Sequence, residues 1–168
     1  MPSFNRKGDI DMSILVAYFS ATGTTARVGE KIARILDCDL YSIKPCLEYT
    51  QADLNWRDSQ SRSSLEMNDA SARPEIIKDD LNTDGYDTIF LGFPIWWYTA
   101  PAIIRTFVEN YDLHGKKIIL FATSGGSGLG ETAAQLKALC PDASFENGKV
   151  LPVSISDQQL RQWLESYL

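Results

Sequence analysis

A short turn rich in hydroxyl groups has the residue types of a phosphate-binding loop. It consists of Ser20, Ala21, Thr22, Gly23, Thr24 and Thr25, and an apolar helix pattern follows it. Hydroxyls, together with the free N–H groups and positive dipole end of a helix N-terminus, bind anions. The turn has no lysine and the chain has no G-x-x-x-x-G-K-[ST] motif, which favours a terminal monophosphate over a nucleoside triphosphate. The alternative is a helix cap that is rich in threonine for local reasons.

Two more loops carry unusual residues. In GFPIWWYTAP, the large side chains follow an apolar run, and the candidate ligand-binding residues are Pro94, Ile95, Trp96, Trp97 and Tyr98. A flat aromatic ligand would cover such rings, although packing under neighbouring loops or a subunit interface would also explain them. In TSGGSG, the residues Ser124, Gly125 and Gly126 let the backbone amides approach a ligand closely. A phosphate, an aromatic plane and a polar ring edge are the parts of flavin mononucleotide (FMN).

Alternating strands and helices must position these loops. Apolar runs predict strands at about 13–19, 39–43, 86–93, 116–122 and 149–155. Apolar spacing predicts helices carrying Val28 to Leu36, Ile76 to Leu81 after Pro74, Ile103 to Tyr111, Leu129 to Cys140, and Leu160 to Tyr167 after a Ser156/Gln159 capping box. This alternation favours a three-layer α/β domain with a five-stranded parallel sheet, in which ligands bind at the carboxyl ends of strands. The loops after the first, third and fourth strands are the three described above.

Composition narrows the choice of partner and compartment. The chain has 168 residues with a formal charge of −6, which argues against a nucleic-acid surface. No apolar run is long enough for a membrane helix. Three cysteines without a C-x-x-C pair suggest neither a disulfide framework nor a metal site, so a reducing cytoplasm is expected. We expect residues 1–11 to be an extra or disordered segment and residues 12–168 to form the domain.

The three motifs together resemble the flavodoxin-like family. SATGTT is similar to its phosphate-loop pattern [ST]-x-T-G-x-T, and GFPIWWYTAP followed by TSGGSG resembles a subgroup of small bacterial flavodoxins. The resemblance covers about residue 12 to the C-terminus. It implies strand order 2-1-3-4-5 and noncovalent FMN, with the phosphate held by Ser20 to Thr25. It also implies that the ring is flanked by Pro94 to Tyr98 and met on its pyrimidine side by Ser124 to Gly126.

The resemblance leaves the redox function open. A one-electron carrier for redox partner proteins is slightly favoured; an FMN-dependent oxidoreductase between NAD(P)H and a quinone-like acceptor is the alternative, and a non-enzymatic flavin-binding module is a third. The polar stretch 44–73 departs from the family pattern, and its Trp56 would cover the ring, lie over a substrate entrance or anchor the loop. Its five acids against four bases do not form a strongly acidic docking face. We expect a monomer or homodimer, no catalytic side chain, and His114 away from the site.

Overall fold

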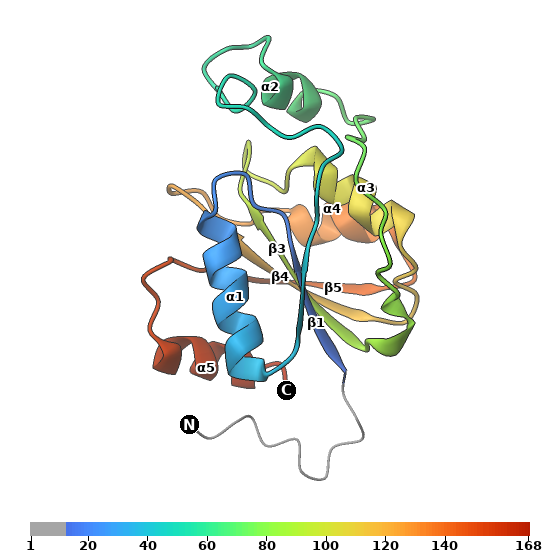
Figure 1. The fold of residues 1–168 in the computed structure, drawn as a ribbon, viewed down its shortest axis with the longest axis vertical. Helices are drawn as coiled ribbons and strands as arrows, with labels where there is room; N and C mark the ends of the chain where they lie inside the picture. Colours follow the sequence, from blue (N-terminus) through green and yellow to red (C-terminus); the bar gives the residue numbers. More distant parts are fainter. Residues whose placement is uncertain (1–12) are drawn as a thin grey trace.

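The strands form one parallel sheet. The computed structural model describes residues 13–168, so the expectation for residues 1–11 falls outside the described part. The strands are β1 (Ile14–Tyr18), β2 (Asp39–Ser42), β3 (Thr88–Pro94), β4 (Lys117–Thr123) and β5 (Ser144–Val150). All neighbours are parallel, in the order β2-β1-β3-β4-β5 (Figure 1). The predicted α/β fold class and the strand order implied by the resemblance are confirmed.

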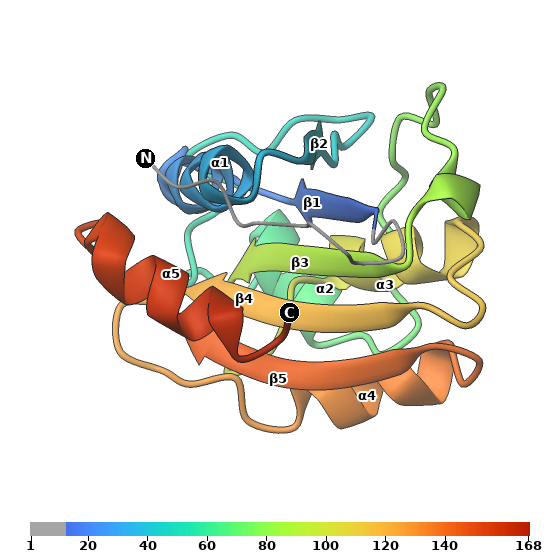
Figure 2. The same cartoon turned by 90° about the horizontal axis from the view of Figure 1, so that it is seen from below.

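Helices cover both faces of the sheet (Figure 2). Helices α1 (Thr24–Leu36) and α5 (Asp157–Glu165) pack on one face, and α3 (Ala102–Asn110) and α4 (Thr132–Leu139) pack on the other. Each follows an apolar spacing predicted above. The Ser156 Oγ accepts the Gln159 N–H at 3.1 Å and the Gln159 side chain accepts the Ser156 N–H at 3.4 Å, so the predicted capping box is confirmed.

The central strands are apolar on both sides because both sides are covered. Ile14, Val16 and Tyr18 of β1 belong to the core under α1 and α5. Leu15 and Ala17, between them, belong to the core under α3 and α4. All are buried, which explains why β1 is a continuous apolar run rather than an alternating one.

The absence of a side chain at Gly92 makes room for a large ring in the core. Gly92 in β3 pairs with Phe121 in β4, and a Cβ added at Gly92 would lie 2.1 Å from the Phe121 ring. A Cβ on Gly29 of α1 would lie 3.7 Å from the same ring. The Phe121 ring therefore fills the space over Gly92 beneath α1.

Replacing Gly92 by Ala is expected to lower the free energy of unfolding by about 1–3 kcal/mol, the usual effect of overpacking a core. The added methyl group has no space unless the Phe121 ring moves. Urea denaturation measures the change. Gly85→Ala is the matched control, because no atom lies within 4 Å of an added Cβ there. Equal losses in the two variants would contradict the packing, whereas adding Phe121→Leu to Gly92→Ala should restore part of the loss.

The helix predicted after Pro74 is wrong. The chain there is extended: the Cys46 N–H bonds to the Glu75 carbonyl at 2.9 Å and the Ile77 N–H to the Lys44 carbonyl at 2.8 Å. Pairing with the chain that follows β2 therefore outweighed a weak helical spacing. A short helix instead lies within the polar stretch, α2 (Arg62–Met67), and a 3₁₀ turn, η1 (Thr83–Gly85), precedes β3.

The last strand is also misplaced in the prediction of 149–155. Strand β5 spans Ser144–Val150, and residues 151–156 lie outside the strand. It is an edge strand whose residues are mostly exposed or half-buried, so its sequence SFENGKV lacks the apolar run used for the prediction. Leu151 and Ile155, which gave that run, are buried beneath α1 and α5 instead.

The carboxyl ends of β1, β3 and β4 lie together, as the parallel sheet requires. The polar stretch 44–73, hereafter the excursion, rises with α2 beyond this edge of the sheet (Figure 1). His114 lies in the turn before β4, at the opposite edge, and its Nδ1 is 3.7 Å from the exposed Asp142 carboxylate. The histidine is therefore away from the loops of interest, as predicted.

Candidate functional site

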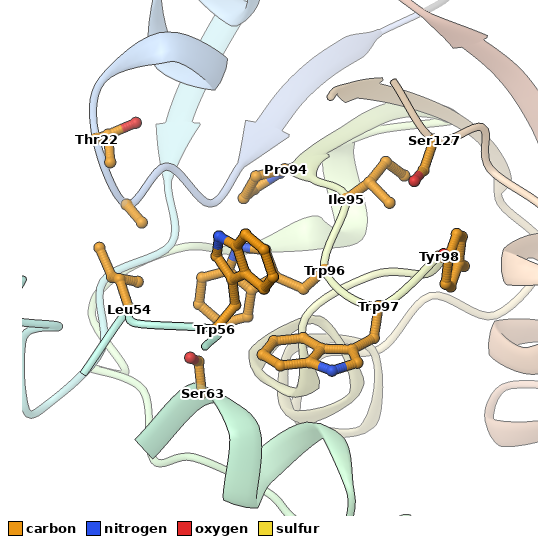
Figure 3. Close-up of a pocket in the computed structure, with 11 residues that line it drawn as sticks. Thr22, Leu54, Trp56, Ser63, Pro94, Ile95, Trp96, Trp97, Tyr98 and Ser127 are labelled. Carbon is orange, nitrogen blue, oxygen red and sulfur yellow. The ribbon is translucent and has the colours of Figure 1, made fainter. Parts of the chain in front are cut away.

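A pocket of about 500 Å³ opens at the carboxyl edge of the sheet (Figure 3). It is lined by Ala21, Thr22, Leu54, Trp56, Ser63, Pro94, Ile95, Trp96, Trp97, Tyr98 and Ser127. The residues come from the loops after β1, β3 and β4 and from the excursion. Three loops singled out by residue type therefore meet at one cavity.

The loop after β1 leads into a helix end that is open to an anion. The residue before α1, Gly23, has φ +93° and supplies no side-chain cap. The first turn of α1 has no acidic residue that would compete with an anion. The Ser20 Oγ accepts the Gly23 N–H at 3.1 Å, which fixes the turn, and the Thr22 and Thr24 hydroxyls lie 3.5 Å apart. This arrangement suits a phosphate group.

Thr25 has a different position from the other hydroxyl residues of this loop. It is buried, and its Oγ1 lies 2.7 Å from the Oγ1 of Thr123 at the end of β4. The hydroxyl is therefore directed into the protein, where it joins the loops after β1 and β4. Thr25 supports the shape of the site from behind.

The tryptophans of the loop after β3 differ in their surroundings. Trp96 is half-buried, with its ring edge-on to Phe19 at 5.8 Å and to Tyr49 at 5.4 Å. Trp97 and Tyr98 are exposed and form the two-residue turn of a small hairpin, closed by hydrogen bonds of 2.9 and 3.1 Å between Trp96 and Thr99. Trp96 thus anchors the loop, while Trp97 and Tyr98 present their rings at its surface.

The hairpin turn holds two bulky residues in left-handed backbone conformations. Trp97 has φ +47° and Tyr98 has φ +65°. Two-residue hairpins normally use Asn or Gly at these positions, because other L-residues are strained there. The strained turn is held from outside, since the Thr99 Oγ1 lies 2.6 Å from the Gln135 Oε1 and 3.0 Å from the Thr132 Oγ1 of α4. Strain of this kind accumulates at ligand-binding sites.

Replacing Tyr98 by Gly should give a protein about 1 kcal/mol more stable than replacing it by Ala, because only glycine adopts this conformation without strain. Both variants lose the same ring, which is 75% exposed, so the comparison isolates the backbone. Thermal and urea unfolding of the two variants measure the difference. Equal stabilities would show that the turn is not left-handed in solution.

The excursion contacts Trp96 through the ring of Tyr49. The Tyr49 hydroxyl donates to the Glu66 carboxylate at 2.5 Å, and the Arg62 guanidinium lies 3.7 Å from the Tyr49 ring centre and 2.9 Å from Glu66. Burial, and then the hydrogen bond to Glu66, raises the pKa of Tyr49, so the hydroxyl stays protonated as a donor. This cluster holds α2 over the site.

The outer wall of the pocket was only partly predicted. Trp56 lines the pocket although it is 67% exposed, and Arg57 lies 5.0 Å from its ring centre. Leu54 and Ser63 were missed, because nothing in the polar excursion marked them. The isolated tryptophan in a polar stretch was the available signal.

The loop after β4 contributes through a residue next to the predicted ones. Ser127 lines the pocket, whereas Ser124, Gly125 and Gly126 do not. The Ser124 Oγ accepts the N–H groups of Gly126 at 3.0 Å and Ser127 at 2.8 Å, so it shapes the turn. Because this serine accepts the Ser127 amide, that N–H is not free for a ligand.

The described residues meet the requirements of neither a metal site nor a membrane-spanning helix. Within residues 13–168, no group of three or more His, Cys, Asp or Glu side chains could hold a metal ion. No helix in the same residues is both long and apolar enough to cross a membrane.

Comparison with known proteins identifies the family. A family model described as Flavodoxin matches residues 13–167. The chain belongs to the flavodoxin family. The family resemblance inferred from the loops is thereby confirmed, while the subgroup suggested by the GFPIWW loop stays a prediction.

Solved structures agree with the flavodoxin assignment. Candidate flavoproteins from Bacteroides eggerthii and Bacteroides uniformis are 49% and 44% identical to this chain, each with a TM-score of 0.86 over 92% of it. The match covers 96% and 98% of those chains. A flavoprotein from Lactobacillus acidophilus, solved in complex with FMN, is 22% identical with a TM-score of 0.67, covering 91% of this chain and 99% of its own. At that identity the last match shows the shared fold.

One further relative is named as a dehydrogenase. NAD(P)H dehydrogenase [quinone] 1 from Rattus norvegicus is 25% identical over a region covering 56% of this flavodoxin-family chain. The matched region spans 43% of the rat protein, so less than half of that enzyme has a counterpart here.

Proposed function

We propose that the protein binds FMN noncovalently and transfers electrons through it. One observation carries the proposal: the open N-terminus of α1 and the aromatic loop after β3 border the same pocket of about 500 Å³. A phosphate-binding helix end beside aromatic side chains suits a flat ring that carries a monophosphate. The FMN in the Lactobacillus acidophilus complex, which has the same fold, supports this choice of ligand.

Each of the three loops would then bind a different part of the cofactor. Hydroxyls and the free amides from Ser20 to Thr24 would bind the phosphate, while the Gly23 N–H stays bonded to Ser20 and Thr25 supports the loop from behind. Residues Pro94 to Tyr98 would lie along the isoalloxazine, and the loop from Ser124 to Ser127 would meet its polar edge. The flavin would supply the redox chemistry, while these groups would bind it, orient it and exclude water.

Titration of the purified protein with FMN and with riboflavin tests this proposal. Riboflavin lacks the phosphate, so its affinity should be lower by about 100-fold if the α1 end contributes two or more charge-assisted hydrogen bonds. Isothermal titration calorimetry measures both affinities. Failure to bind FMN would reject the proposal. Equal affinities for FMN and riboflavin would show that the α1 end does not bind the phosphate, although the ring would still bind in the pocket.

A second candidate, an FMN-dependent NAD(P)H oxidoreductase, is favoured by the excursion. Leu54, Trp56 and Ser63 give the pocket an outer wall facing the loop after β3. A carrier needs an exposed flavin edge for a partner protein, whereas a wall of this kind suits a second flat substrate. The partial similarity to the rat NAD(P)H dehydrogenase is consistent with such a reaction.

Anaerobic reduction of the FMN-loaded protein separates the two candidates. Rapid reduction by NADH or NADPH in one two-electron step, followed by reoxidation with a quinone, is expected of the oxidoreductase. Slow direct reduction, with two resolved one-electron steps in an electrochemical titration, is expected of the carrier. A protein that binds FMN but is neither reduced by nicotinamides nor exchanges electrons with carrier proteins would be the non-enzymatic module.

A further inference from the structure

A second cavity, of about 530 Å³, lies on the other side of the Trp97–Tyr98 hairpin. Its lining residues come from the end of α2 and the turn that follows it, from the loop after β3, and from α3 and α4. Its apolar surface comes mainly from Met67, Ala100, Leu136 and Leu139. Trp97 lines both this cavity and the larger pocket, so the hairpin is a wall between them.

The only charged side chain on this cavity's lining is a half-buried cation. Arg105 on α3 uses its Nη1 to donate to the carbonyl oxygens of Asp69 at 3.1 Å and Ala70 at 2.8 Å. Among residues 13–168, no carboxylate lies within ion-pairing distance of Arg105, and its Nε and Nη2 make no hydrogen bond. Burial lowers the pKa of the guanidinium, but arginine stays charged in proteins.

The acids nearest to Arg105 are already engaged. The Asp69 carboxylate accepts the N–H and the hydroxyl of Ser71, at 2.9 and 2.6 Å. Glu109 pairs with Arg73. Glu66 pairs with Arg62, so these carboxylates act on Arg105 only from beyond ion-pairing distance, and a bound anion would supply the direct charge-assisted contact that none of them makes.

A neutral donor accompanies this cation. The Gln135 Oε1 accepts the Thr99 hydroxyl at 2.6 Å, which orients the amide. Its Nε2 makes no hydrogen bond within the described part of the chain. Arg105 and Gln135 therefore both offer N–H donors to a ligand at this cavity, beside the Asn68 side-chain amide, an apolar surface and an indole.

We propose that this cavity is a second ligand site for an organic anion, a carboxylate attached to a flat apolar body. The carboxylate would pair with Arg105 and Gln135, and the body would lie against Trp97, Leu136 and Leu139. The two planar faces of Trp97 and the shared hairpin would connect this site to the larger pocket. The site does not depend on FMN binding.

Binding of 2-naphthoate, compared with neutral 2-naphthamide, tests the proposal. Calorimetry on the wild-type protein should show that naphthoate binds about tenfold or more tightly than the amide, since charge-assisted hydrogen bonds distinguish the two. Binding should persist when FMN is present in saturating amounts. No binding of naphthoate, equal affinities for the two probes, or displacement of naphthoate by FMN would each overturn the proposal.

Variants distinguish a ligand site from a structural arginine. Arg105→Gln should reduce naphthoate affinity to that of the amide. Arg73→Gln combined with Glu109→Gln is the matched control, because Arg73 also donates to the Ala70 carbonyl but does not line the cavity, and the second change removes the carboxylate that Arg73 would otherwise release. Ala138→Phe, at an exposed position of α4 on the cavity lining, should block both probes without disturbing the core.

FMN affinity in these variants tests the FMN proposal separately from the second site. All of them should retain wild-type FMN affinity, since none of the replaced residues lines the larger pocket. If the Arg73→Gln, Glu109→Gln double variant weakens naphthoate as much as Arg105→Gln does, Arg105 only fastens the chain at residues 69–70 and the proposal fails. If Ala138→Phe leaves naphthoate binding unchanged, the probe binds elsewhere and the proposal also fails.

Discussion

Replacing Thr24 by Asp is expected to weaken FMN binding by about 100-fold, because a carboxylate a few ångströms from a phosphate repels it strongly near a protein surface. Thr24 is the first residue of α1, whose first turn has no acid. The same change should leave the FMN-free protein as stable or about 0.3–1 kcal/mol more stable, since acids are favoured at helix N-termini. Calorimetry with FMN and unfolding without it measure the two opposite effects.

Two comparisons make the Thr24 prediction specific to phosphate. Thr24→Asn has nearly the same size without the charge and should retain most of the FMN affinity. Riboflavin, which has no phosphate, should bind Thr24→Asp and the wild-type protein equally. If Thr24→Asp weakens riboflavin and FMN to the same extent, the α1 end is not a phosphate site.

Replacing Trp96 by Ala is expected to lower the free energy of unfolding by about 2–4 kcal/mol, somewhat less than the loss of a fully buried tryptophan. The indole packs against Phe19 of the core and Tyr49 of the excursion, so its removal separates the loop after β3 from both. Urea denaturation measures the loss. FMN affinity should fall as well, because the loop loses its anchor.

Trp56→Ala is the matched control for Trp96→Ala. Trp56 lines the same pocket but is 67% exposed, so its replacement should change stability by no more than about 0.5 kcal/mol. If the protein is an oxidoreductase, Trp56→Ala should weaken binding of the second substrate. Similar losses of stability in the two variants would show that Trp96 is not the anchor of the loop.

The features that could be predicted from sequence are those fixed by local chemistry or by burial on both sides. Strand β1 is apolar throughout because helices cover both faces, and α5 begins at a capping box that is visible in the sequence. The parallel sheet then brings the loops after β1, β3 and β4 together. Residue types in those loops therefore predicted the location of the pocket.

The features that could not be predicted depend on tertiary context. Strand β5 is paired on one side only and is largely polar, so its apolar signal was weaker than that of the loop after it. Ile76 is buried by pairing of its neighbours with the chain after β2, although its spacing is helical. In the pocket, Leu54 and Ser63 arrive through the fold of the excursion, and the roles of Thr25 and Ser124 as supports became visible only from their hydrogen bonds.

The buried bond between Thr25 and Thr123 has a consequence for how the protein is made. The two hydroxyls are 98 residues apart, and the second belongs to the end of β4. A growing chain that has not yet reached Thr123 already contains the hydroxyl-rich turn but not the group that supports it from behind. The turn therefore gains this support only after β4 has joined the sheet, so a binding site that depends on the support is complete only late in synthesis.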